Sequence, residues 1–451
     1  MCVNLHDEAH NVTSLGMVRV TGSMPAEKAL ELLDARLEEF GLDRERHIVG
    51  ATTDGASVMI KLGRLMNTEH QQCHSHGIHL AVVDLIYKAS SSDSLPPPLV
   101  DLDEEEDSDE ENEEGEGEEE ETDNATDSMF PELNDQLVPI IKKVRKIVRI
   151  FRKSPMKNDT LQKYIKAKNP TAKTLNLVID VRTRWNSLLA MLRCFLRVID
   201  AVEKALIDFA LRNLILTEEE VELLKMVVDV LETIEIGAVA LGSNEMDILQ
   251  ADRIFEFMLK KLEENGSSTG NTMVGITQQR IFQRRNQPLV GVLYYLSSPE
   301  PSESTLDYPS KPEVAKKIRD LYVRLFWRQD HEPCNEEEVI EPAEKVSKLE
   351  ELQQYLNRNE SSAPKQNFSS QAGILTQIKK EMSVFESTGE HPACIEKVFR
   401  AVRSIPPTST EAERAFSAAG LFLTKIRSSL SDQSIDNLCL LRKHFLNMKK
   451  D

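Results

Sequence analysis

The sequence contains few cysteines, and no two of them form a C-x-x-C pair. Its 451 residues include six scattered thiols, at Cys2, Cys73, Cys194, Cys334, Cys394 and Cys439. This spacing excludes a zinc finger built on cysteine pairs and argues against a disulfide framework, so we expect reduced thiols in an intracellular protein. No apolar run approaches the length of a membrane-spanning helix, and no signal-peptide pattern is visible, so we expect no membrane partner.

Negative charge is abundant but concentrated in one segment. The formal net charge is -20, and residues 101–123 (DLDEEEDSDEENEEGEGEEEETD) hold 17 acids and no base, which leaves a net charge of -3 on the rest. So few apolar residues cannot bury enough surface to fold, which predicts an acidic disordered loop over residues 90–129. Two interpretations of this loop remain open: a solvated insertion within one fold, or a docking segment for a basic protein partner.

Residues 1–89 have the pattern of an α/β unit, with strands expected at 13–22 and 48–51 and helices expected at 23–40 and 76–89. Ser23 is expected to cap the first helix, with Pro25 in its first turn. The second strand runs directly into Asp54 and Gly55. An aspartate at a strand tip before a glycine can hold a metal or a catalytic position, and it can equally form an ordinary turn.

Beyond the acidic loop the pattern is mainly helical. Residues 137–154 form a basic amphipathic stretch, and residues 174–181 (TLNLVIDV) predict one further strand. Thr217 and Glu220 have the spacing of a capping box at the start of a long helix. Helical spacing then continues to about residue 380, which predicts a large all-α block.

Three groups of residues are candidates for binding. Cys73 and His76 have the spacing of two metal ligands, although a zinc site needs four positions, so we expect them to pack at the start of a helix. Trp185, between Arg184 and Asn186, either stacks on a nucleic-acid base or lies half-buried at an interface. The basic stretch either contacts DNA or forms the solvated side of its helix; its cations are Lys142, Lys143, Arg145, Lys146, Arg149, Arg152 and Lys153.

The segment 404–447 carries a large apolar surface close to the end of the sequence. A proline pair and a Thr-Ser-Thr cap precede Glu413, and apolar residues then recur at helical spacing. Such a surface needs a partner, either the rest of the domain or a second chain. The residues expected to associate are Phe416, Leu421, Phe422, Leu438, Leu441 and Phe445.

Four motifs, taken together, resemble the hAT (hobo/Activator/Tam) transposases, closest to their zinc-finger-BED-like branch. They are TTDGAS at 52–57, CHSHGIHL at 73–80, TRWNS at 183–187, and TSTEAERAFSAAG at 408–420 with KIRSSLS at 425–431. The resemblance implies a nuclear protein with an RNase H-like core, interrupted by a large α-helical insertion and closed by the hAT dimerisation helices. The implied parts are 1–89 and 130–188 for the core, 90–129 for the acidic loop, 189–380 for the insertion and 381–451 for the dimerisation region.

The resemblance also assigns roles to individual residues. Asp54 and Glu413 match the second and third of three acids that hold two divalent metals, Mg²⁺ or Mn²⁺ in an active form. Trp185 matches a tryptophan that stacks on cleaved DNA, and Cys73 and His76 match the C-x-x-H beside the core. The first acid and the BED finger have no match in this sequence, so we expect two remnant acids, a truncated core, no cofactor and no catalytic activity.

Three functions remain open from sequence. The chain is either a domesticated, inactive, dimerising nuclear protein associated with DNA, or a fragment of an active metal-dependent transposase with a missing N-terminus. The third alternative is an interaction scaffold without DNA contact, which the near-neutral charge of the folded part allows. We predict the first, as a homodimer or a higher oligomer formed through the C-terminal region.

Overall fold

The computed structural model describes most of the chain outside the acidic segment. The described residues are 1–87, 131–169, 174–181, 185–243, 246–285, 287–298, 309–327, 371–420, 422 and 431–447. The predicted acidic loop at 90–129 lies outside them, as do Arg184 and Leu421. Most described residues are helical, and no helix among them is long and apolar enough to cross a membrane.

An antiparallel hairpin opens the chain. β1 (Cys2–His6) pairs with β2 (Val12–Met17), which overlaps the first half of the strand predicted at 13–22. The Asp7 carboxylate closes the hairpin, because its Oδ1 accepts hydrogen bonds from the backbone N–H groups of Ala9 and Asn11 at 2.9 Å each. Asp7 is therefore engaged in its own turn.

A second pair of strands is parallel and carries the Asp54 turn. β3 (Gly50–Thr53) and β4 (Glu69–Gln72) are joined by the crossover helix α3 (Ser57–Leu65), against which α1 (Ala26–Glu39) packs. The short α2 (Arg44–His47) leads into β3. In the described residues these pairs form two separate two-stranded sheets, so a single RNase H-like sheet remains a prediction.

Ser23 does not cap the first helix, so that prediction was wrong. The N-cap position of α1 is Pro25, in an extended conformation and without a side-chain hydrogen bond. Proline fixes its own φ near the value that a helix start requires, so the helix begins here without a polar cap.

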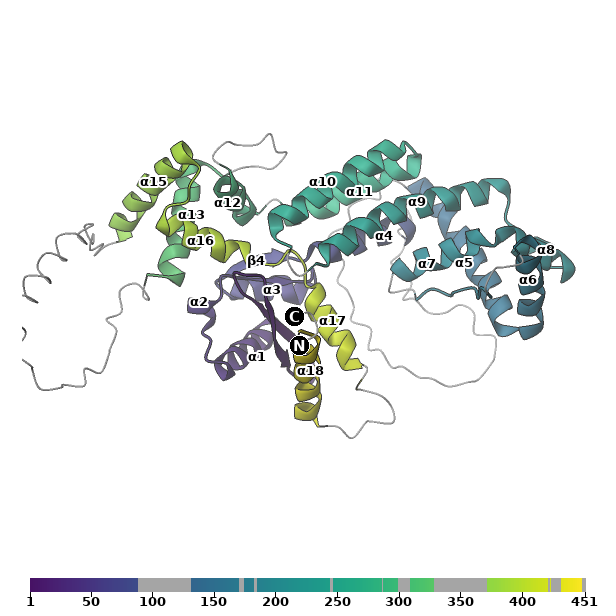
Figure 1. The fold of residues 1–451 in the computed structure, drawn as a ribbon, viewed down its shortest axis with the longest axis horizontal. Helices are drawn as coiled ribbons and strands as arrows, with labels where there is room; N and C mark the ends of the chain where they lie inside the picture. Colours follow the sequence, from purple (N-terminus) through teal and green to yellow (C-terminus); the bar gives the residue numbers. More distant parts are fainter. Residues whose placement is uncertain are drawn as a thin grey trace, which may run out of the picture.

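One large helical core occupies one side of the molecule (Figure 1). Buried residues from all of its long helices form a single hydrophobic cluster. The capping box of Thr217 and Glu220 is confirmed at the start of α9. The elements of this part are α4 (His74–Tyr87), α5 (Pro131–Lys153), α6 (Pro155–Lys168), α7 (Trp185–Arg197), α8 (Ile199–Asp208), η1 (Arg212–Leu214), α9 (Glu218–Leu241), α10 (Ile248–Asn265) and α11 (Ser268–Arg285).

A smaller helical cluster lies on the opposite side of the strands (Figure 1). Arg324 of this cluster donates to the carbonyls of Ile48 and Val49 at 2.7 and 2.8 Å, which fixes the start of β3. Its elements are α12 (Pro288–Ser297), α13 (Lys311–Leu325), α15 (Gln371–Thr388) and α16 (Ala393–Arg403).

Residues 174–181 are not a strand, contrary to the sequence prediction. Side chains of α5 and α6 replace the strand partner: Gln162 accepts from the Leu175 N–H at 3.1 Å and donates to its carbonyl at 2.8 Å. Arg152 donates to the Leu177 carbonyl at 3.1 Å. Apolar alternation predicted the extended backbone, but it does not reveal which groups satisfy the backbone hydrogen bonds.

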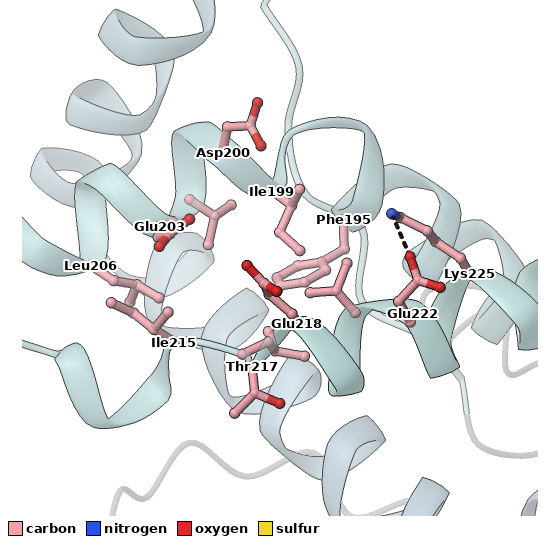
Figure 2. A pocket seen from close by; sticks show the side chains of 13 residues that line it. Phe195, Ile199, Asp200, Glu203, Leu206, Ile215, Thr217, Glu218, Glu222 and Lys225 are labelled. Carbon is pink, nitrogen blue, oxygen red and sulfur yellow. Dashed lines mark ion pairs between the residues drawn. The ribbon is translucent and has the colours of Figure 1, made fainter.

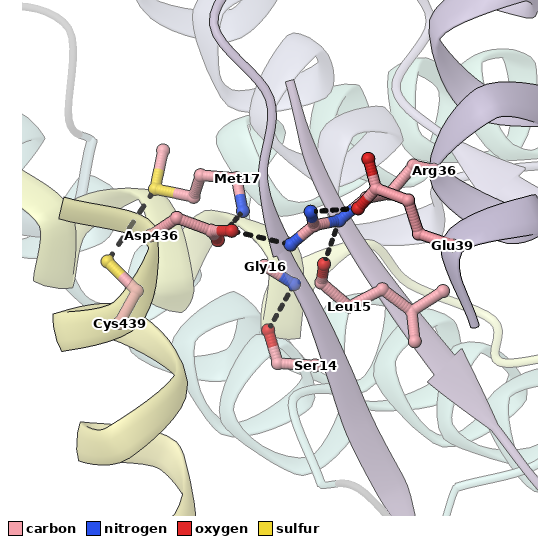
Figure 3. Close-up of polar contacts among 8 residues, drawn as sticks. All are labelled: Ser14, Leu15, Gly16, Met17, Arg36, Glu39, Asp436 and Cys439. Atoms are coloured by element: carbon pink, nitrogen blue, oxygen red, sulfur yellow. Dashed lines mark hydrogen bonds and ion pairs between the residues drawn. The ribbon is translucent and has the colours of Figure 1, made fainter. Parts of the chain in front are cut away.

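Two C-terminal helices, α17 (Thr410–Gly420) and α18 (Asp432–Asn447), return to the N-terminal hairpin. Figure 3 shows the Asp436 carboxylate of α18 pointing towards Met17 of β2 and Arg36 of α1. Its Oδ1 accepts from the Met17 N–H at 2.7 Å, and its Oδ2 lies 2.6 Å from Nη2 of Arg36. The Arg36 guanidinium also donates to the Leu15 carbonyl, so one ion pair connects three elements.

Gly16 makes this contact sterically feasible. Its φ is +87°, and a Cβ at this position would lie 2.0 Å from Oδ1 of Asp436. We therefore expect Gly16→Ala to displace α18 and to lower the free energy of unfolding. Gly22→Ala is the matched control, because Gly22 also has a positive φ but nothing within 4 Å.

Urea unfolding checks this expectation. The left-handed backbone costs an alanine roughly 1–2 kcal/mol at either position. Gly16→Ala loses about 1–3 kcal/mol more, because the clash with Asp436 adds to the backbone strain. Equal losses in the two variants would contradict the proposed contact.

Candidate functional site

The segment 405–410 lies across the ends of β3 and β4. Thr52 Oγ1 donates to the Pro406 carbonyl at 2.5 Å, and the His74 N–H donates to the Pro407 carbonyl at 3.0 Å. The Ser409 N–H points at Sγ of Cys73, 3.3 Å away. Hydrogen bonds between residues more than 330 positions apart thus bring the start of α17 to the turn that follows β3.

Asp54 and Glu413 both lie at this meeting point. Asp54 follows β3 and accepts from the Ala56 N–H at 3.2 Å. Glu413 lies in the first turn of α17 and accepts from Ser409 Oγ at 3.3 Å. Burial raises the pKa of the Cys73 thiol, and the nearby Glu413 carboxylate raises it further. The two carboxylates that the resemblance pairs are therefore attached to one structural junction.

The donor set at this junction does not form a complete metal site. Among the described residues, no group of three or more His, Cys, Asp or Glu side chains is arranged to hold a metal ion. Arg414, beside Glu413, pairs instead with Glu411 at 2.6 Å, and Glu411 also binds Lys443 of α18 at 2.5 Å. These residues connect α17 to α18.

Cys73 and His76 occupy the start of α4. Cys73 is fully buried, and His76 is half-buried with its ring 6.2 Å from the ring of His79. The Cys73 sulfur accepts a backbone hydrogen bond from Ser409, the residue before α17, so its position links the two parts of the chain. The packing role expected for Cys73 and His76 remains a prediction.

Trp185 begins α7 and is half-buried against the large helical core. The adjacent Arg184 lies outside the described residues. The partial burial leaves both interpretations of Trp185, interface packing and base stacking, compatible with the structure.

The basic residues of α5 divide into two sets, apart from Arg152 and Lys153 at its end, which are exposed. Lys142, Lys146 and Arg149 are exposed, and their spacing of four and three residues places them on one helical face. Lys143 binds Glu220 at 2.8 Å. Arg145 is buried and binds Asp180 at 2.5 Å, so its guanidinium is not part of the exposed face.

The apolar residues expected to associate also divide. Leu438 and Phe422 are partly covered by the chain itself, whereas Phe416, Leu441 and Phe445 are 65%, 51% and 58% exposed. The buried face of α18 includes Cys439, whose sulfur lies 3.8 Å from that of Met17 (Figure 3). The C-terminal helices thus bury one face against their own hairpin and leave a second apolar face open.

A cavity of about 630 Å³ lies away from these residues, between α7, α8 and the start of α9 (Figure 2). Its lining combines apolar side chains such as Phe195 and Leu206 with the carboxylates of Glu203 and Glu218. None of the candidate binding residues of the sequence analysis lines it.

Sequence reasoning missed Arg284 at the end of α11. Its side chain reaches the Asp54 turn, where a Cβ on Gly55 would lie 3.0 Å from its Nη2. No motif marks this arginine. The only sequence signal is its neighbour, Arg285, with which it forms a basic pair at the end of a helix.

His74, next to Cys73, gives the junction a pH dependence. It is 1% exposed, its ring packs edge-on against Phe255, and burial lowers its pKa to about 4. An unfolded histidine titrates near 6.5, so between pH 6.5 and 4 the unfolded chain binds a proton that the folded chain does not. The contribution of His74 to the free energy of unfolding is therefore fully present above pH 6.5. As the pH approaches 4 it is lost, by up to roughly 3 kcal/mol.

Urea unfolding at pH 7.5, 6.0 and 5.0 measures this loss. His74→Leu is expected to flatten the dependence in this window, whereas the same substitution at the exposed His47 leaves it in place. An identical pH dependence in wild type and His74→Leu would show that His74 is not the group responsible.

Comparison with known protein families matches one part of the chain. Residues 127–230 match the ZBED1 RNase-like helical domain, a span that includes α5 to α8, most of α9, Trp185 and the basic face of α5. No curated protein matches the chain. The matched span contains neither Asp54 nor Glu413. It relates the helical part of this chain to ZBED/hAT-like transposase-derived proteins.

Proposed function

We propose that this chain is a transposase-derived nuclear protein that associates with itself through α17 and α18, binds DNA and does not cleave it. The observation that carries the proposal is the open apolar face of Phe416, Leu441 and Phe445 on helices whose opposite face is already packed. Full burial of one such side chain contributes about 1.5–3 kcal/mol. In a two-fold dimer, each copy would cover these three residues of the other copy, so six exposed apolar side chains would be buried.

The electrostatics of the C-terminal region support self-association. Glu411 is paired with Arg414 and Lys443, and Asp436 with Arg36, so these two acids already have cationic partners within the same chain. An interface centre that excludes water tolerates paired charges far better than unpaired ones. Glu413, three residues before Phe416, is exposed and accepts from Ser409 Oγ, so we expect it at the solvated rim of such an interface.

The DNA association rests on the exposed stripe of Lys142, Lys146 and Arg149. Cations on one helical face attract the phosphate backbone without reading sequence. The acidic segment at 101–123 precedes this helix in the chain, and we propose that it binds a basic protein partner. Both roles would place the protein on chromosomal DNA in the nucleus.

A second candidate is a fragment of an active, metal-dependent DNA-cutting enzyme. The observation that favours it is the junction of β3, β4 and α17, which holds Asp54 and Glu413 at the same edge. Nicking of supercoiled DNA in Mg²⁺ or Mn²⁺, abolished by Asp54→Asn, would favour this candidate over association alone.

Light scattering of the purified chain tests the self-association. We expect a dimer or a higher oligomer, and we expect Phe416→Asp to shift the mass towards the monomer, because it puts a charge at the centre of the apolar face. The matched control is Phe257→Asp on α10, where the phenylalanine is 48% exposed and lies outside the C-terminal region. A folded wild-type monomer, or an equal effect of both substitutions, would contradict the proposal.

A further inference from the structure

Arg284 brings a positive charge from the helical part to the Asp54 turn. It lies at the end of α11, which packs along α4, and it is 6% exposed. Its backbone carbonyl accepts from Nε2 of Gln71 at 3.1 Å, which anchors the residue beside β4. The side chain passes Gly77, where a Cβ would lie 2.9 Å from its Cδ, and ends at Gly55.

This guanidinium has no carboxylate partner among the described residues, in contrast to its neighbours. Arg280 binds Asp84 through two hydrogen bonds of 2.6 and 2.9 Å, and Arg285 binds Asp252. Nη1 of Arg284 donates to the Arg280 carbonyl at 2.5 Å, whereas its buried Nε lacks a hydrogen-bond partner within the described part of the chain. Burial lowers the pKa of Arg284, and no carboxylate counteracts the effect.

A buried, unpaired charge is unfavourable unless an anion joins it. The end of the Arg284 side chain lies beside the start of α3, a nine-residue helix whose N-cap, Ala56, provides no side-chain hydrogen bond. Ala56 and Ser57 are exposed, so an anion can approach from solvent. The backbone N–H groups at a helix start and a guanidinium both favour phosphate.

Gly55 keeps this approach open. Its backbone does not have the left-handed conformation that requires glycine. A Cβ at Gly55 would instead lie 3.0 Å from both Nη2 of Arg284 and Cδ2 of His76. The absence of a side chain at Gly55 therefore leaves room for the Arg284 guanidinium beside the turn.

We propose that Arg284 and the N-terminus of α3 bind a phosphate group of a DNA strand that passes the Asp54 turn. The inference deepens the proposed DNA association and rests on it for the source of the phosphate. It adds a second contact point, on the sheet side of the molecule, to the basic face of α5. Asp54 Oδ1 already accepts from the Ala56 N–H, so a phosphate here would use Arg284 and the N–H groups that follow Ala56 in α3.

Inorganic phosphate is the probe for the site itself. Titrated phosphate should raise the Tm of the full chain more than chloride does at equal ionic strength. Arg284→Met should fold, because it removes a charge that has no carboxylate partner, and it should weaken the apparent phosphate affinity about 10- to 100-fold, as expected for lost charge-assisted hydrogen bonds.

Two glycine variants test the same site without removing Arg284, so the result does not depend on whether Arg284→Met folds. Gly55→Ala retains the guanidinium but fills the approach, so it should also weaken phosphate binding. Gly420→Ala is its control, because nothing lies within 4 Å of that position. A wild-type Tm that phosphate does not raise, or phosphate affinities that are equal in the wild type and Gly55→Ala, would overturn the proposal.

A single-stranded oligonucleotide then tests the source of the phosphate. Arg284→Met should weaken its binding in fluorescence anisotropy and lower the slope of log K against log salt by about 1. Unchanged oligonucleotide binding in Arg284→Met, with phosphate binding lost, would overturn the assignment to DNA.

A separate experiment tests the proposed DNA association. The double variant Lys142→Glu/Lys146→Glu should reduce oligonucleotide binding and leave the phosphate-dependent rise in Tm intact. A wild-type chain that binds phosphate through Arg284 but shows no affinity for DNA would refute the DNA association, and with it the DNA source, while supporting the anion site.

Discussion

The Asp436 carboxylate joins the two ends of the described chain. It accepts from the Met17 N–H and pairs with Arg36, which also donates to the Leu15 carbonyl, so β2, α1 and α18 share one partly buried network. Removing one partner from such a network leaves an uncompensated charge, which is costly. Together with the Ser409–Cys73 contact, it fixes α17 and α18 on the N-terminal strands and determines which of their faces stays open.

This docking gives the C-terminal region two distinct surfaces. The inner surface completes the N-terminal hairpin, and the outer surface exposes Phe416, Leu441 and Phe445. The same docking brings Glu413 to the edge that carries Asp54, and Arg284 of the helical part reaches that edge from α11. Three regions that are distant in sequence therefore meet at one turn.

Sequence patterns predicted the local features well. Thr217 and Glu220 form their capping box because its partners are three residues apart. A strand precedes Asp54 as predicted, although it covers Gly50–Thr53 instead of 48–51. The failures concern partners far along the chain. Residues 174–181 are held by Gln162 and Arg152 instead of a strand, and Arg145 is buried by Asp180. Periodicity identifies a helical face but not the distant carboxylate that covers part of it.

Hydrogen exchange measured at several protein concentrations tests the central claim, that docking leaves an associating face on α17 and α18. The account predicts that the backbone amides of 432–447 exchange slowly even at high dilution, because α18 packs on the N-terminal hairpin of its own chain. It further predicts that protection over 410–420 and 432–447 increases with concentration, while that of 26–39 on α1 does not change. Protection of the two C-terminal helices that is independent of concentration would contradict the account, because their exposed apolar face would then have no partner.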